Sequence, residues 1–153
     1  MARRAYPARS GGFSLVELMV VVAVLGILAS IAVPNYQDYV LRSKLVDALS
    51  SLAQLRVSME HYYQDNRSYD SAPGEPTGNC GIAMAASNYF TYSCATSNTG
   101  QGFLITATGT AGGATAAFAY TIDHGNNRRT TAMAEGWGSA PAECWVNTKG
   151  QTC

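Results

Sequence analysis

Apolar residues form one almost unbroken run near the start of the chain. Residues 13–33 contain Glu17 as their only charged side chain, and Pro34 follows directly. An α-helix rises about 1.5 Å per residue, so a helix over this run would be about 31 Å long. The hydrocarbon core of a bilayer is about 30 Å thick. The pattern therefore predicts a membrane-spanning helix.

Beyond Pro34 the apolar positions become periodic. They recur at steps of three and four residues, which is typical of an amphipathic helix. The stripe consists of Leu41, Leu45, Ala48, Leu49, Leu52, Leu55, Met59, Tyr62 and Tyr63. We expect one helix over about residues 13–64, with its second half packed on a core. Pro34 lacks the N–H of the helical ladder and crowds the preceding turn, so it should kink this helix.

The remaining chain carries short patterns that are typical of strands. Residues 65–78 are rich in Gly, Pro, Asp and Ser and predict a loop. Four later segments favour strands: residues 89–94, 103–108, 117–122 and, more weakly, 129–133. We therefore expect an α+β fold, in which the long helix packs on an antiparallel sheet of about four strands.

The residues before the apolar run are short and basic. Residues 1–12 include Arg3, Arg4 and Arg9 and end in Gly11-Gly12. In a secretory signal the small-residue cleavage site follows the apolar stretch, whereas here the small residues precede it. Cleavage after Gly12 would remove the leader and keep the helix. The arginines place the leader in the cytoplasm and the rest of the chain outside.

Glu17 is unusual because a lone carboxylate in an apolar helix is costly without a partner. Two interpretations remain open. The carboxylate can lie near the helix start, where the helix dipole favours it and it can reach the membrane interface. Alternatively, it pairs with the α-amino group that cleavage creates on Phe13, in the same subunit or a neighbouring one.

The segment Gly12-Phe13-Ser14-Leu15-Val16-Glu17, followed by the apolar stretch and Pro34-Asn35-Tyr36, resembles the N-terminus of type IV pilins. When Phe13 is counted as the first mature residue, Glu17 is the fifth and Pro34 the twenty-second, where pilins carry a Glu and a Pro. The resemblance covers residues 11–40 and implies cleavage after Gly12 and N-methylation of Phe13 by a prepilin peptidase.

The resemblance also implies a division of the chain and a route through the cell. Residues 1–12 would be the removed leader, 13–40 the membrane and filament-core helix, and 41–153 the head domain. The subunit would reside in the inner membrane and then join other pilin subunits in an extracellular filament, through an inner-membrane assembly platform. Glu17 would act in that assembly.

The chain has 4 cysteines, Cys80, Cys94, Cys144 and Cys153, on the exported side. An even number there suggests two disulfides, for which three pairings exist. We favour Cys80–Cys94 and Cys144–Cys153, because each pair closes a short local loop, the second at the C-terminus. The spacings contain no Cys-x-x-Cys, and no Cys/His signature surrounds the histidines, so we expect no metal or other cofactor.

Charge argues mildly against broad binding of nucleic acid. Loss of three leader arginines from 10 basic residues leaves 7 against 10 acidic ones, a net charge of about −3. Arg128-Arg129 is the only basic pair outside the leader. With Lys149 it could contact DNA phosphates, but we favour the interpretation that it is a solvated hairpin.

These observations lead to three hypotheses for the function. The leading one is a structural subunit of a type IV pilus, a minor pilin of the kind resembling PilE, serving adhesion, twitching motility or DNA uptake. The cysteine-rich β region and Cys144-Trp145 favour this subgroup. The alternatives are a DNA-binding pilin for natural transformation and a pseudopilin of type II secretion. No catalytic motif is present in the sequence, so an enzyme is not expected.

Overall fold

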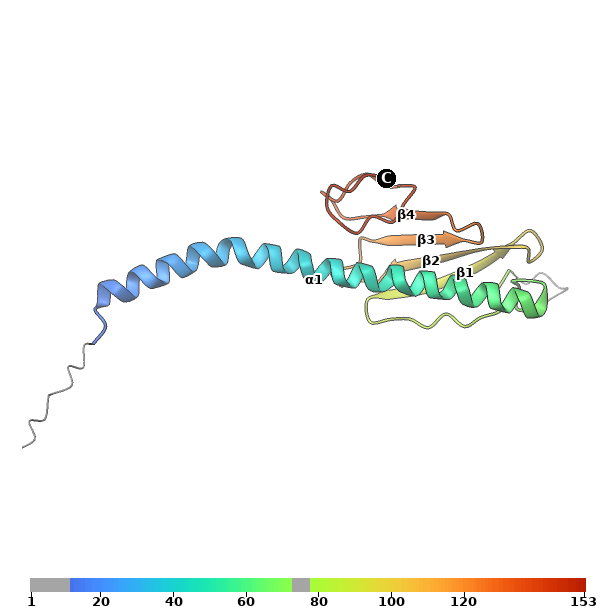
Figure 1. Ribbon diagram of the computed structural model, residues 1–153, viewed down its shortest axis with the longest axis horizontal. Coiled ribbons are helices and arrows are strands. Elements are labelled where there is room, and N and C mark those ends of the chain that lie inside the picture. The colour runs from blue at the N-terminus through green and yellow to red at the C-terminus, as the bar shows by residue number, and fades with distance from the viewer. Residues whose placement is uncertain (1–11, 73–77) are drawn as a thin grey trace, which may run out of the picture. The chain divides into compact units, whose positions relative to one another are not determined.

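The computed structural model describes residues 12–72 and 78–153 (Figure 1). The elements follow in the order α1 (Leu15–Asn66), β1 (Phe90–Ser97), β2 (Gly102–Gly109), β3 (Ala119–Asp123) and β4 (Arg128–Ala132). The leader predicted at residues 1–12 lies outside the described residues, except for Gly12. The second of two compact units extends over Tyr39–Cys153 and is described below as the head.

Helix α1 begins with a side-chain cap. Ser14 Oγ accepts a hydrogen bond from the backbone N–H of Glu17 at 3.2 Å, and the Ser14 carbonyl accepts one from Leu18 at 3.2 Å. Ser at the cap position with Glu three residues later is a typical N-terminal signal. Glu17 therefore lies in the first turn, where the helix dipole stabilises its negative charge.

The helix ends two residues later than the sequence predicts. Arg67 adopts a left-handed conformation, with φ of 58°, and its N–H donates to the Tyr63 carbonyl at 2.7 Å. This bond closes the helix as an αL cap. Pro34 lies within α1, and the kink that we expect at it stays a prediction.

The apolar side chains in the N-terminal half of α1 are exposed among the described residues. Leu15 is 75% exposed and Val33 is 53% exposed. The helix includes a window with a mean hydropathy of 2.7, which by length and composition is sufficient to cross a membrane.

The head is built on a four-stranded antiparallel sheet in the order β1-β2-β3-β4. The helix covers one face of this sheet (Figure 1). Leu45, Ala48, Leu52 and Met59 of the predicted stripe are fully buried. Opposite them the strands contribute Phe90, Phe103, Ile105, Tyr120 and Ile122, each at most 1% exposed. Burial of this apolar surface is the main term that stabilises the head.

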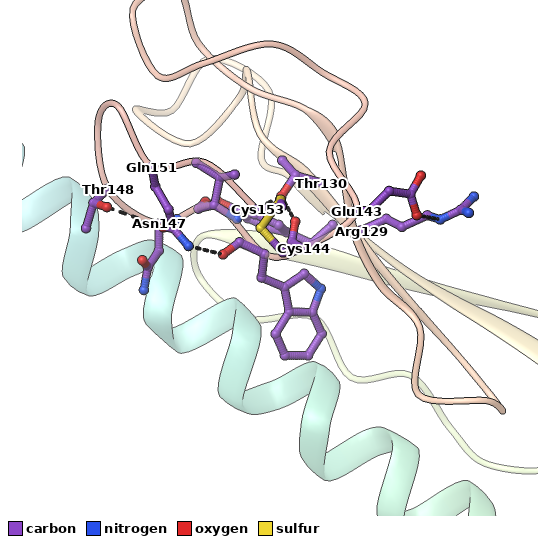
Figure 2. Close-up of a disulfide and its surroundings, with 11 residues drawn as sticks. Arg129, Thr130, Glu143, Cys144, Asn147, Thr148, Gln151 and Cys153 are labelled. Atoms are coloured by element: carbon purple, nitrogen blue, oxygen red, sulfur yellow. Dashed lines mark hydrogen bonds and ion pairs between the residues drawn. A yellow bond between two sulfur atoms is a disulfide. The ribbon is translucent and has the colours of Figure 1, made fainter.

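Two disulfides fasten the head's loops. Cys80 is joined to Cys94 of β1, and Cys144 is joined to Cys153, so both bonds are local. The second bond closes the C-terminal loop, residues 144–153. Figure 2 shows this disulfide beside Thr130 of β4.

Thr130 connects the C-terminal loop to the sheet. Its side chain is fully buried. Its Oγ1 donates a hydrogen bond to the Cys144 carbonyl at 2.7 Å and accepts one from the Val146 N–H at 2.9 Å. Tyr120 of β3 donates its hydroxyl to the Val146 carbonyl at 2.8 Å. These bonds satisfy buried backbone groups of the loop, so the loop's position depends on two strands.

We predict that Thr130→Val destabilises the head by about 2 kcal/mol, because a near-isosteric change leaves the Val146 N–H and the Cys144 carbonyl without their partner. Thr131→Val is the matched control, since Thr131 is the exposed neighbour on the other face of β4. Denaturant unfolding of the full chain in mild detergent, followed by circular dichroism, measures both. Equal stability of the two variants would contradict the role given to Thr130.

Alkaline pH should weaken the fold through buried tyrosines. Burial and the hydrogen bond from its hydroxyl to Glu60 raise the pKa of Tyr69 to about 12, and burial also raises the pKa of Tyr120. Unfolded tyrosines titrate near pH 10. Between about pH 10 and 12 the unfolded chain therefore holds fewer protons, so stability present below pH 10 is lost as the pH rises.

The test is the unfolding midpoint measured from pH 8 to 12. Tyr69→Phe should lose less stability across the window from about pH 10 to 12 than the wild type does, because one titrating group is gone. Tyr39→Phe is the control at an exposed tyrosine, 71% accessible. A wild-type midpoint that stays flat above pH 10 would contradict the prediction.

Candidate nucleic-acid interface and assembly residues

A groove of about 630 Å³ lies between α1, the β3–β4 turn and the C-terminal loop. We call it the amide groove, because four carboxamide side chains line it. Its lining residues are Leu49, Asn126, Asn127, Arg128, Glu143, Cys144, Trp145, Asn147 and Gln151. Figure 2 shows Asn147 and Gln151 on the C-terminal loop beside α1. The lining combines amide donors and acceptors with one cation and one anion.

The β3–β4 turn is held by Asp123. Its carboxylate accepts bonds from the Asn127 backbone N–H at 2.9 Å and from Asn127 Nδ2 at 2.8 Å. Burial opposes ionisation of this carboxyl group, but the bonds from Asn127 outweigh it and lower the pKa of Asp123. Asn126 occupies the left-handed region with φ of 62°, which Asn tolerates in turns. The turn therefore presents Asn126 in a fixed position.

Gln151 organises the C-terminal loop from within. Its Oε1 accepts bonds from the Asn147 N–H at 3.0 Å and from Thr148 Oγ1 at 3.3 Å, and its Nε2 donates to the Trp145 carbonyl at 3.2 Å. Within residues 12–72 and 78–153, no hydrogen bond to the carboxamide of Asn147 is found. Gln151 is thus a positioning residue, and Asn147 is the loop amide available to a ligand.

Arg128 is held at the groove by an aromatic ring. Its guanidinium carbon lies 4.8 Å from the centre of the Trp145 ring, a cation–π contact. Trp145 is itself fixed, because its Nε1 donates to the Thr121 carbonyl at 2.9 Å. The Arg128 Nε also donates weakly to Asn126 Oδ1 at 3.4 Å. A planar guanidinium held in this way can bind a phosphate or the O6 and N7 edge of guanine through two donors.

The structure separates the three residues proposed for DNA contact. Arg128 pairs across the strands with buried Ile122, and Arg129 pairs with Thr121. Successive strand residues point to opposite faces, so the two arginines do not form one patch. Arg129 Nε instead contacts Glu143 Oε2 at 2.7 Å (Figure 2). Lys149 is exposed on the C-terminal loop.

Several residues of the groove were missed by sequence reasoning, namely Asn126, Asn127, Glu143, Asn147 and Gln151. Asn126 and Asn127 directly precede the basic pair, and this polar run was a usable signal. Glu143, Asn147 and Gln151 reach the groove because the chain folds back after β4, which no local pattern shows.

The residues expected in assembly lie at the start of α1. Gly12 and Phe13 precede the helix, and Glu17 is an exposed residue of its first turn. Among the described residues of this single chain, Glu17 forms no ion pair. No group of three or more His, Cys, Asp or Glu residues suited to a metal ion is found in the part of the chain that the structure describes.

Two family models match the chain. One, described as "Type IV minor pilin ComP, DNA uptake sequence receptor", matches residues 34–121. The other, "Prokaryotic N-terminal methylation motif", matches residues 7–33. The second segment includes Gly12, Phe13 and Glu17. Most of the amide groove, from Asn126 onward, follows the first segment, so the match does not itself locate a binding site.

Curated relatives are fimbrial proteins. The chain is 42% identical over 77 residues to the type IV major fimbrial protein FimA of Dichelobacter nodosus, covering 50% of this chain and 44% of the relative. It is 38% identical over 99 residues to fimbrial protein EcpC of Eikenella corrodens, covering 63% and 61%. A probable minor fimbrial protein of Dichelobacter nodosus is 38% identical over 77 residues, covering 50% and 46%. The chain thus spans about half the length of these relatives.

A solved type IV pilin from Shewanella oneidensis aligns with a TM-score of 0.46 and 21% identity, covering 57% of this chain and 88% of that one. The family itself rests on the sequence models, of which the first covers more than half of the chain. Pilins are structural proteins and not catalysts. The chain belongs to the ComP family of type IV minor pilins.

Proposed function

We propose that this pilin is cleaved after Gly12, methylated on Phe13 and carried by its N-terminal helix into a pilus, where its head binds DNA. The division into leader 1–12, helix 13–40 and head 41–153 is part of this proposal. So is the route from the inner membrane, through the assembly platform, to the cell surface. The methylation motif and the exposed apolar half of α1 support the assembly steps.

Glu17 would set the register of assembly. Its carboxylate is exposed in the first turn of α1, and cleavage would give Phe13 a cationic amine. In an apolar surrounding the two charges attract more strongly than in water, and either one left alone is costly. Pairing of Glu17 with the Phe13 amine of a neighbouring subunit would therefore favour one axial position.

Glu17→Ala should reduce the ratio of filament-borne to membrane-borne protein about tenfold, equivalent to about 1.4 kcal/mol of lost interaction. Insertion and cleavage should persist, which mass spectrometry would show as a mature chain that begins with methyl-Phe13. Glu17→Gln keeps the size and removes only the charge, so it should behave like Glu17→Ala. An unchanged ratio in both variants would mean that packing alone sets the register.

Arg128, held over Trp145 at the amide groove, is the observation that carries the DNA-binding proposal. Arginine and asparagine are the side chains best suited to base edges in DNA. The net charge of the chain is small and gives little general attraction to DNA phosphates. Binding of DNA would therefore depend on a few fixed contacts. The family description adds support, since it names a receptor for DNA uptake sequences.

Arg128→Ala should lower the affinity for duplex DNA about tenfold. The slope of log affinity against log salt should also fall, by the amount that corresponds to about one phosphate contact. Arg128→Lys should restore little, because lysine neither stacks on the ring in the same way nor offers a planar fork. The assay is fluorescence anisotropy with the full mature chain in detergent, at several salt concentrations. Its probes are duplexes enriched by the wild type from a random library.

Arg42→Ala is the matched control, because it removes one exposed positive charge from α1 and Arg42 is not among the residues that line the groove. An equal loss in Arg42→Ala would show that only overall charge matters. If the wild-type chain binds no duplex, the DNA-binding proposal is wrong, and only the proposal of a filament subunit remains. The pseudopilin alternative gains no support from the family models, which describe a type IV minor pilin.

A further inference from the structure

Arg129 and Glu143 form an exposed ion pair next to the amide groove. The two side chains approach to 2.7 Å while remaining 55% and 66% exposed. Glu143 also lines the groove, whereas Arg129 lies on the outer face of β4, opposite Arg128. The Glu143 carboxylate thus borders the proposed DNA site and also pairs with Arg129, which faces away from that site.

A free arginine on the outer face would weaken selection between sequences. All DNA carries the same phosphates, and a phosphate contact fixes position without reading bases. An unpaired Arg129 would give any duplex a second place to bind, on the face that lacks the groove's amides. Selectivity is a difference between two affinities, so strengthening this second mode would reduce it.

We infer that Glu143 is a specificity-determining residue of the DNA site, because it holds Arg129 in an ion pair on the outer face of β4 and suppresses phosphate binding there. The inference rests on the proposed function and concerns the same site. The carboxylate acts through Arg129, since the ion pair keeps this arginine from phosphate.

The effect should be moderate. Exposed ion pairs are weak, so DNA can compete with Glu143 for Arg129. The neighbouring negative charge nevertheless lowers the local potential, most at low salt, where screening is least. We expect loss of this charge to strengthen the binding of random duplexes by about three- to tenfold at low salt, with one additional phosphate contact.

The geometry allows this role to be separated from folding. The C-terminal loop is fastened by its disulfide, by Thr130 and by Tyr120. The side chain of Glu143 is exposed, and its ion pair with Arg129 is the interaction found for it among the described residues. Glu143→Gln should therefore leave the fold intact, which circular dichroism would verify.

The experiment compares Glu143→Gln, Arg129→Gln and the double variant with the wild type, using the full mature chain in detergent. The probes are a random-sequence duplex and a duplex enriched by the wild type. Glu143→Gln should bind the random duplex about three- to tenfold tighter and the enriched duplex only slightly tighter, so the selectivity ratio falls. In the double variant the gain in affinity for the random duplex should disappear, because this gain depends on Arg129.

Glu135→Gln is the matched control, since it removes the same charge from an exposed glutamate of the head for which no arginine partner is found in residues 12–72 and 78–153. An equal gain in Glu135→Gln, or a gain that survives in the double variant, would overturn the inference. An unchanged selectivity ratio in Glu143→Gln, with a wild type that still prefers its enriched duplex, would also overturn the inference. The proposed function would then stand. A wild type that binds no DNA would overturn both.

Discussion

The apolar surface of α1 is the constraint on which the rest of the protein depends. In the head, Leu45, Leu52 and Met59 find partners in the sheet and are fully buried. From Leu15 to Val33 the large apolar side chains of the same helix are exposed in the part of the chain that the structure describes. The cost of exposing this surface to water has to be offset by lipid or by other subunits. This segment therefore favours apolar surroundings, whereas the head has a buried core of its own.

The candidate DNA site depends on contacts that join distant parts of the chain. Thr130 and Tyr120 hold the C-terminal loop against β4 and β3, and Trp145 of that loop supports Arg128. The loop is thus a structural support for the groove as well as part of its lining. Its closure by Cys144–Cys153 restricts the unfolded chain.

Most of the fold could be predicted because its signals are local. The period of the apolar stripe identified the helix and its buried face, and aromatic, β-branched and alternating segments identified the four strands to within a few residues. The site was less accessible to such reasoning. Adjacent arginines look like one patch in the sequence, yet strand geometry sends Arg128 and Arg129 to opposite faces. Glu143 and Asn147 join the site only through the folded loop, which depends on long-range bonds.

The cation–π contact has a practical consequence. The chain contains 2 tryptophans, of which Trp137 is 2% exposed and packs against Phe118, whereas Trp145 lines the groove. A ligand that displaces or reorients Arg128 changes the electric field over the Trp145 indole and thus its emission. The protein therefore carries an intrinsic optical reporter at its candidate site, and Trp137 supplies the internal reference within the core.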